Sequence, residues 1–219
     1  MAEKEIEVME AVYGRNEEVA EELNRRLSNK RVFCCNVMGA PGVGKTSLLR
    51  GIIPLLDARS WVVEGDIESS IDTEKLRAEG VSTHQINTGG ACHLDSPLVA
   101  DAVSELRPES GYLFIENIGN LVCPAEFLIG EHLKLLISNV TEGSDKPYKY
   151  PLAFEKAGII LVNKVDLMPY VDFDRDYFLK GVRALNKEAP VLFVSTKTGE
   201  GLEEAAKWLM EHAASVIGA

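Results

Sequence analysis

Three segments of the chain carry residue types that could together hold a nucleoside triphosphate. The first, Gly39-Ala40-Pro41-Gly42-Val43-Gly44-Lys45-Thr46, fits the phosphate-binding P-loop pattern at every defined position. Its glycines allow backbone N–H groups to turn toward phosphate oxygens, and a helix that starts here adds further donors. We expect Lys45 to reach the β- and γ-phosphates and the Thr46 hydroxyl to ligate Mg²⁺. A chance glycine-rich turn is the alternative, and the strand and helix predicted on either side argue against it.

The second segment, Asn163-Lys164-Val165-Asp166, predicts that the base is guanine. A carboxylate at Asp166 can accept hydrogen bonds from the ring N–H and the exocyclic amine of guanine, whereas adenine offers neither group there. Such a site rejects a ligand without the matching groups by roughly 10⁴-fold or more. Lys164 can lie over the base, and Asn163 can tie this loop to the P-loop. The third segment, Ser195-Thr196-Lys197, resembles the remaining guanine-contacting loop of GTPases.

Two acidic residues that follow apolar runs are candidates for the Mg²⁺ site. Glu116 lies where a Walker B acid is expected, and Glu116-Asn117-Ile118-Gly119 resembles the usual Asp-x-x-Gly with Glu in place of Asp. Gly119 could offer its N–H to the γ-phosphate. Asp66 is the second candidate, and an acid at this position could instead cap the next helix. No glutamine follows Gly119 to orient the attacking water, so we expect slow intrinsic hydrolysis, accelerated by a partner or by dimerisation.

The expected nucleotide contacts are therefore Gly39, Ala40, Pro41, Gly42, Val43, Gly44, Lys45, Thr46, Ser47, Gly119, Asn163, Lys164, Asp166, Ser195, Thr196 and Lys197. The expected catalytic residues are Lys45, Thr46, Asp66 and Glu116, of which the last three also ligate Mg²⁺.

Cys92, His93 and Cys123 form a candidate transition-metal site. Cys92-His93 follows one predicted strand and Cys123 another, so their loops would flank the γ-phosphate if the two strand ends are neighbours in the sheet. Thiolates and an imidazole suit Zn²⁺ or Ni²⁺, and three ligands leave a fourth position for water or a second subunit. Two unrelated cysteines are the alternative, because no Cys-x-x-Cys spacing compels a metal. Cys34 and Cys35, adjacent in a strand, are interpreted as buried core residues on opposite faces.

An α/β fold must position these segments. Apolar and β-branched runs predict strands at 31–37, 61–63, 81–86, 112–115, 133–140, 158–162 and 190–194. Helical patterns occupy 17–27, 45–56, 73–79, 97–106, 174–186 and 202–216, and 145–150 is interpreted as a polar loop. Continuously apolar strands that alternate with helices indicate the three-layer P-loop NTPase fold, a mostly parallel sheet flanked by helices, with ligands beyond the carboxyl ends of its strands. Residues 1–30 are expected to form a helical extension packed on a G domain of residues 31–219, a single structural domain overall.

The composition excludes some functions. The formal net charge is -11, whereas a nucleic-acid binder needs clustered Lys and Arg, so no nucleic-acid partner is expected. No apolar run approaches the ~20 residues that cross a bilayer, and residues 1–10 lack a signal-peptide profile, so no membrane is expected either. Four cysteines in a chain of 219 residues do not suggest a disulfide framework, which favours the reducing cytoplasm.

Three stretches, 90–95, 116–124 and 163–166, together resemble the nickel-insertion GTPases of hydrogenase maturation, the HypB family. The resemblance extends from Arg31 to the C-terminus and implies a SIMIBI-class G domain that forms a homodimer when GTP is bound. It implies Ni²⁺ or Zn²⁺ held by Cys92, His93 and Cys123 near the dimer interface. It also implies delivery of nickel to the large subunit of NiFe-hydrogenase, together with the zinc-containing partner HypA.

Two departures narrow the resemblance, and other functions stay open. Residues 1–30 contain no Cys or His, so high-affinity nickel storage is not expected, and the P-loop lacks the extra lysine of many SIMIBI ATPases near Pro41. A urease-type nickel chaperone GTPase would carry Cys-Pro-His, and here Cys123-Pro124 is followed by Ala125. A regulatory GTP-binding module with inert cysteines is a further alternative, as is a small-molecule kinase, which would need an acceptor-binding lid and no guanine motif.

Overall fold

The structure is a computed structural model that describes the backbone of residues 2–66 and 71–218 and the side chains of residues 14–65 and 73–218. Its centre is a sheet of seven strands, all paired in parallel: β1 (Val32–Gly39), β2 (Ser60–Asp66), β3 (Ser82–Asn87), β4 (Gly111–Glu116), β5 (Leu133–Asn139), β6 (Ile159–Asn163) and β7 (Val191–Phe193). Their order across the sheet is β3-β2-β4-β1-β5-β6-β7. The predicted fold class is confirmed, and the sheet is wholly rather than mostly parallel among the described strands.

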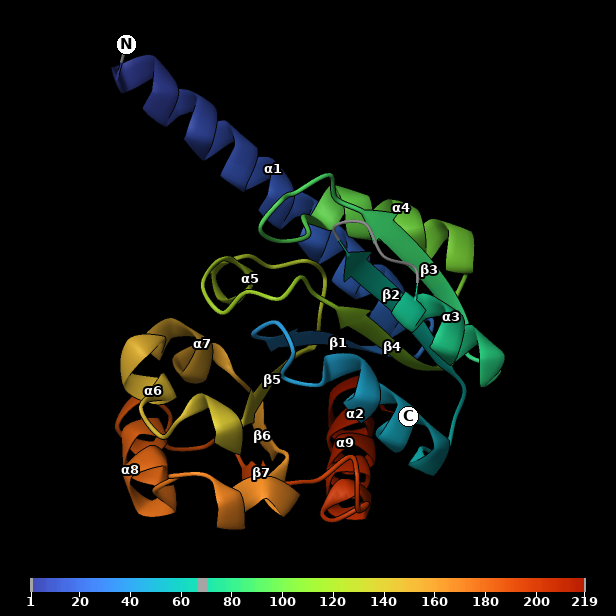
Figure 1. The fold of residues 1–219 in the computed structure, drawn as a ribbon. Helices are drawn as coiled ribbons and strands as arrows, with labels where there is room; N and C mark the ends of the chain where they lie inside the picture. Colours follow the sequence, from blue (N-terminus) through green and yellow to red (C-terminus); the bar gives the residue numbers. More distant parts are fainter. Residues whose placement is uncertain (1, 67–70, 219) are drawn as a thin grey trace.

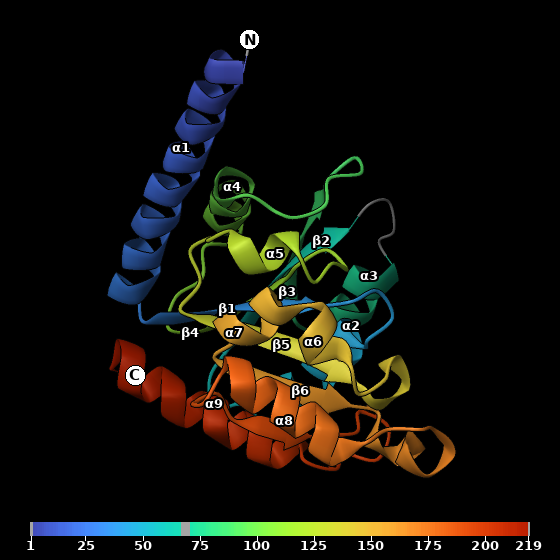
Figure 2. The same cartoon turned by 90° about the vertical axis from the view of Figure 1, so that its left-hand side faces the viewer.

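Helices cover both faces of this sheet (Figures 1 and 2). The α-helices are α1 (Ala2–Asn29), α2 (Lys45–Ile52), α3 (Ile71–Ala78), α4 (Ser96–Leu106), α5 (Cys123–Glu126), α6 (Lys146–Lys149), α7 (Pro151–Lys156), α8 (Arg175–Leu185) and α9 (Leu202–Ile217). Three short 3-10 helices complete the described elements: η1 (Ile53–Leu55), η2 (Val140–Glu142) and η3 (Val165–Tyr170). Helices α2 and α9 pack on one face of the sheet and share a core with β1. On the opposite face, α1 and α4 cover β2 and β4, and α7 and α8 cover β5 and β6.

The continuously apolar strands explain the double covering. In β1 every residue is buried, and alternate side chains enter different cores, with Cys35 on the α2–α9 side and Cys34 on the α1–α4 side. This arrangement confirms the interpretation of the two cysteines as core residues on opposite faces. Because both faces of the central strands are packed, β1 is held rigidly at the point where the P-loop begins.

Helix α1 begins at Ala2, well before the predicted start near residue 17, and its first half projects beyond the rest of the chain (Figure 1). Residues 2–16 include many good helix formers such as Ala, Glu, Lys and Met, so apolar periodicity alone underestimated the length of this helix. Its last part packs against the sheet through Leu23 and Leu27, which are buried together with residues of β1 and α4. The division of the chain into residues 1–30 and 31–219 stays a prediction.

Three short α-helices, α5, α6 and α7, were not predicted. The interpretation of residues 145–150 as a loop was wrong, because α6 occupies most of it, and α5 and α7 were missed. Each is too short to display helical periodicity, yet each carries a proline in its first turn, at Pro124, Pro147 and Pro151. Proline favours that position because its fixed φ suits a helix start and it lacks an N–H that would need a partner.

None of the helices among the described residues combines the length and the apolar character that crossing a membrane requires.

Candidate nucleotide and metal site

The P-loop connects β1 to α2 at the carboxyl edge of the sheet. Gly42 and Gly44 have φ angles of 71° and 101°, in the left-handed region that favours glycine. A Cβ on Gly44 would lie 2.7 Å from Asn163 Nδ2, so a side chain here would displace the neighbouring loop. The first turn of α2 points its backbone donors toward this turn, and the segment therefore has the form of a phosphate cradle.

A buried hydrogen bond joins the start of α2 to the end of β4. Thr46 Oγ1 donates to Glu116 Oε1 at 2.9 Å, and both side chains are buried. A hydroxyl and a carboxylate side by side form an oxygen donor set of the kind that Mg²⁺ takes. The structure thus brings together two of the three residues expected at the Mg²⁺ site. The third, Asp66, ends β2, and its side chain lies outside the described residues.

Glu64 is a buried acidic residue that the sequence reasoning missed. It aligns with Glu116 across β2 and β4, and Thr73 Oγ1 donates to its carboxylate. Aligned residues on neighbouring parallel strands point from the same face, so a second carboxylate stands beside the predicted Mg²⁺ acid. The spacing of Glu64 and Asp66 could have indicated it, because strand residues two positions apart share a face.

The two loops predicted to bind guanine lie against each other and against the P-loop. Asn163 Nδ2 donates to the Val43 carbonyl at 3.2 Å, and Asn163 Oδ1 accepts from the Thr196 N–H at 3.3 Å. Asn163 therefore ties both loops to the phosphate cradle, as the sequence reasoning expected for one of them. Ser195 Oγ donates to Asp166 Oδ1 at 2.6 Å, which fixes the orientation of that carboxylate.

The lysines of these loops take different positions. Lys164 Nζ donates to the Gly42 carbonyl at 2.8 Å, so its side chain runs along the P-loop. Lys197 Nζ lies 3.9 Å from Asp166 Oδ2 and is exposed. Ser47, Thr196 and Lys197 line one hollow beside α2. The residues predicted to contact the phosphates and the base thus surround one region at the carboxyl edge of β1, β6 and β7.

The segment after β4 touches the P-loop directly. A Cβ on Gly119 would meet Pro41 Cγ at 2.9 Å, and Asn120 forms an isolated antiparallel bridge with Gly39. The Asn120 side chain donates to the Cys92 carbonyl at 3.0 Å and accepts from the Val122 N–H at 2.9 Å. Asn120 therefore contacts the P-loop and the segments that carry both cysteines.

Cys92, His93 and Cys123 form one cluster in which a ligand atom of each lies within 4.8 Å of the others. Cys92 Sγ is 3.3 Å from His93 Nδ1, and the His93 ring stacks on Phe127 with centroids 4.1 Å apart. Cys92 is exposed, while Cys123 and His93 are half-buried. Two sulfurs and one nitrogen at this separation can hold a soft or borderline metal ion with one open position.

The protonation of the cluster follows from its contacts. A hydrogen bond with the Cys123 thiol is the main cause that raises the pKa of the Cys92 thiol, and partial desolvation raises it further. Burial lowers the pKa of His93, which keeps the imidazole neutral and able to ligate a metal. Metal binding therefore requires loss of thiol protons, so the apparent affinity should rise with pH.

The two strand ends that were expected to place the cysteine loops beside the γ-phosphate are not neighbours in the sheet, although the three metal-ligand candidates do come together. Strands β3 and β4 are not neighbours, because β2 lies between them. The loop after β3 reaches β4 by crossing the end of β2 at Gly65, where a Cβ would lie 2.9 Å from Leu94. Leu94 is fully buried, and its N–H donates to Asn117 Oδ1 at the end of β4. A glycine at the crossing thus allows the Cys92-His93 loop to reach Cys123.

The fold and the two adjacent sites define a P-loop GTPase. Residues 33–193 match the family model "CobW/HypB/UreG, nucleotide-binding domain". The hydrogenase maturation factor HypB of Rhizobium leguminosarum bv. viciae is 44% identical over 215 residues, covering 97% of this chain and 72% of the relative. The hydrogenase/urease maturation factor HypB of Helicobacter pylori strain J99 is 34% identical, covering 96% and 89%.

Similarity in structure is equally extensive. The crystal structure of HypB from Helicobacter pylori in complex with nickel superposes with a TM-score of 0.87 and 33% identity, covering 92% of this chain and 96% of that one. The chain belongs to the HypB family.

Proposed function

We propose that this protein is a GTP-binding and GTP-hydrolysing metallochaperone that couples GTP-dependent dimerisation to nickel delivery during NiFe-hydrogenase maturation. One observation carries the proposal: Asn120 bridges Gly39 of the P-loop and binds the segments of Cys92 and Cys123. A nucleotide that reorders this segment changes the positions of two metal ligands at once. The family, and the nickel bound by its relative of known structure, support the choice of cargo.

The reaction is the hydrolysis of GTP by water to GDP and phosphate. The P-loop and Lys45 hold the phosphates, Asp166 selects guanine, and Thr46 and Glu116 hold Mg²⁺, with Asp66 and Glu64 as further acids near it. Mg²⁺ held by these residues would supply positive charge that stabilises the phosphates, and Gly119 would offer its N–H to the γ-phosphate. Ile118 and Asn120 flank Gly119, and neither is a general base, so the monomer turns over slowly.

The surface around the metal cluster is suited to a protein partner. Val122 and Leu128, on either side of α5, are 53% and 45% exposed, although both are large and apolar. Cys92 lies at the surface beside them, and its cluster offers three ligands. A second copy in the GTP state can cover this area and complete the coordination. A HypA-like zinc protein and the hydrogenase large subunit are the further partners in the cytoplasm.

Metal titration in two nucleotide states tests the proposal. Ni²⁺ and Zn²⁺ are added to protein loaded with GDP or with a non-hydrolysable GTP analogue, and thiolate–metal absorption reports binding. Wild type should bind about one ion per chain or per dimer, with different affinities in the two states. Cys92→Ala and Cys123→Ala should each weaken binding by more than ~10-fold, since each removes one of three ligands. Cys34→Ala, which removes a buried core thiol, is the matched control and should bind as wild type.

Two results would contradict the proposal. Equal binding by wild type, Cys92→Ala and Cys123→Ala would show that the cluster is not the metal site. Equal affinity in both nucleotide states would leave metal binding uncoupled from GTP, because a ligand shifts an equilibrium only through differential affinity.

A second cargo recipient has one supporting observation. The Helicobacter pylori relative is described as a hydrogenase/urease maturation factor. The same nickel site could serve a urease partner as well, and nickel transfer from loaded protein to each apo-enzyme separates the two.

A further inference from the structure

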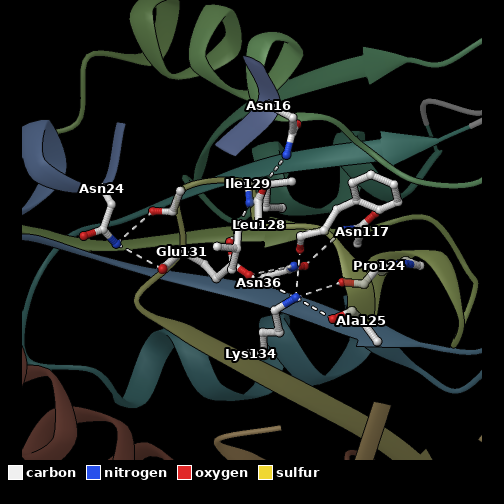
Figure 3. Close-up of polar contacts among 12 residues, drawn as sticks. Asn16, Asn24, Asn36, Asn117, Pro124, Ala125, Leu128, Ile129, Glu131 and Lys134 are labelled. Atoms are coloured by element: carbon white, nitrogen blue, oxygen red, sulfur yellow. Dashed lines mark hydrogen bonds and ion pairs between the residues drawn. The ribbon is translucent and has the colours of Figure 1, made fainter. Parts of the chain in front are cut away.

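A buried charged network joins β5 to the segment that follows Cys123 (Figure 3). At its centre Lys134 and Glu131 form an ion pair at 3.4 Å, and their side chains are only 8% and 3% exposed. Lys134 belongs to β5, where both sequence neighbours are leucines of the core. An ammonium in a core position costs free energy unless its surroundings satisfy it, so its contacts indicate what it stabilises.

Lys134 holds the segment that contains Cys123. Its Nζ donates to the carbonyls of Pro124, Ala125 and Phe127 at 3.2, 2.9 and 2.8 Å. These carbonyls lie at the end of α5, where helical C=O groups have no partner within the helix. A cation at a helix C-terminus is favourable, and α5 is too short to be stable without tertiary contacts. Lys134 thus fixes the helix whose first residue is Cys123, and it also fixes Phe127, on which His93 stacks.

The same network reaches the other metal loop. Glu131 Oε2 accepts from the Ile129 N–H at 2.8 Å, and Asn36 of β1 donates to Glu131 Oε1 at 3.5 Å. Asn117 Nδ2 donates to Asn36 Oδ1 at 3.1 Å, and Asn117 Oδ1 accepts from the Leu94 N–H, one residue after His93. An unbroken set of polar contacts therefore runs from the carbonyls after Cys123 to the backbone after His93.

We propose that the Lys134–Glu131 pair, through Asn36 and Asn117, is a positioning unit that holds the Cys123 helix and the Cys92-His93 loop at the separation required for one metal ion. Lys134 acts through the backbone and is not itself a metal ligand. This inference rests on the metal-binding part of the proposed function. It adds that a buried ion pair orients the metal ligands, in addition to the contact that Asn120 makes with the P-loop.

Lys134→Met tests the inference, because methionine keeps the length and apolar stem of lysine and removes the donors. Loss of a group that orients metal ligands typically weakens affinity by ~10–100-fold, and we expect a loss in this range for Ni²⁺. We also expect a changed thiolate–Ni²⁺ absorption spectrum and, without metal, faster alkylation of Cys123 by iodoacetamide. GDP affinity should stay at the wild-type value, because no nucleotide contact is removed.

Two further variants separate positioning from general damage. Lys146→Met removes a lysine whose ion pair with Glu142, at 3.2 Å, is also largely buried but contacts neither metal loop. This control should bind Ni²⁺ as wild type does. Lys134→Met combined with Glu131→Gln leaves no unpaired charge in the core, so it should regain thermal stability while its Ni²⁺ affinity stays low.

The outcomes distinguish this inference from the proposed function. Wild-type Ni²⁺ affinity and spectrum in Lys134→Met, or their return in the double variant, would overturn the positioning role and leave the metal site intact. Loss of Ni²⁺ affinity in Lys146→Met to the same degree would show a general stability effect and would also overturn it. If wild type binds Ni²⁺ no better than Cys92→Ala, the metal site itself fails, and the inference fails with it.

Discussion

The Asp166 carboxylate lies where two loops meet, and its neighbours determine how it can act. One oxygen accepts from Ser195, which leaves the other free to turn toward a base, with Lys197 3.9 Å away. Asn163 holds both loops against the P-loop, so the residues predicted to contact base and phosphates are parts of one arrangement. Under the proposed function, specificity for guanine depends on this carboxylate, whose position is fixed before binding.

Asp166→Ala should therefore lose guanine affinity and leave the fold unchanged. Because the variant removes the group that pairs with both guanine donors, GDP affinity should fall by at least ~10²-fold, and preference over ADP should nearly vanish. Fluorescent GDP and ADP titrations measure both. Asp101→Ala, at an exposed position on α4, is the control and should bind GDP normally. Retained selectivity in Asp166→Ala would show that guanine is read elsewhere.

Single residues differed in how far the sequence could identify them. Cys92, His93 and Cys123 were found because their chemistry is rare, and Thr46 and Glu116 because their motif places them. Lys134 gave no signal, since a lone lysine in an apolar run is usually interpreted as a surface residue. Its role depends on three carbonyls that come from another segment, and no pattern along the chain encodes such a contact.

At the level of elements, the long buried strands were predictable and the connections between them were not. Continuous apolar runs identified the fully buried strands β1, β4, β5 and β6, because a strand packed on both faces has no polar alternation. The pattern along the chain does not give the order of the strands in the sheet, so the placement of β2 between β3 and β4 was not predicted. The absence of a side chain at Gly65 lets the loop that carries Cys92 and His93 cross β2. A glycine in a strand indicates that another group approaches closely, but the sequence does not identify that group.

The junction of α1 with the sheet should be sensitive to acid through His132. Its Nδ1 accepts from the Cys34 N–H at 2.9 Å, and its Nε2 lies 2.8 Å from Ser28 Oγ, so the ring is held as the neutral tautomer. Burial lowers the pKa of His132 from 6.5 to about 4. The unfolded chain therefore takes up a proton before the folded one, and this contribution to stability is present above the unfolded pKa and is lost as pH falls toward 4.

Urea unfolding at about pH 7 and about pH 5 measures this contribution. His132→Gln should have a lower free energy of unfolding than wild type at the higher pH. The difference between the two proteins should become smaller at the lower pH. His84→Gln, which replaces a surface histidine paired with Glu105, is the matched control. A difference between wild type and His132→Gln that does not change with pH would contradict the assignment.

The whole molecule presents its nucleotide loops and its metal cluster at one edge of a parallel sheet. The carboxyl ends of the central strands converge there, so the α/β architecture alone makes them neighbours. The acidic net charge of -11 disfavours close approach of two copies, and burial of apolar surface must offset that repulsion. Val122 and Leu128 supply such surface beside the cluster.

Dimerisation should therefore require both the GTP state and this apolar area. Sedimentation of wild type with a non-hydrolysable GTP analogue should show a dimer, and with GDP a monomer. Val122→Ser should weaken the dimer by roughly 10-fold, the order expected for losing one buried aliphatic side chain. Leu55→Ser, at a residue that is 39% exposed just after α2, is the control. Equal masses in both nucleotide states would contradict GTP-dependent dimerisation.

The crossing of β2 by the Cys92-His93 loop has a thermodynamic consequence. The thiols of Cys92 and Cys123 come from loops after β3 and β4, which are separated by β2, so the fold brings them together and the unfolded chain has no preformed site for an ion. An ion that binds the native form alone stabilises it by mass action, by about 2.7 kcal/mol when its free concentration is 100 times Kd. Under the proposed function the metal cargo is also a ligand that stabilises the fold, and the chain should be most easily unfolded, and most open to proteolysis, just after it has released its metal.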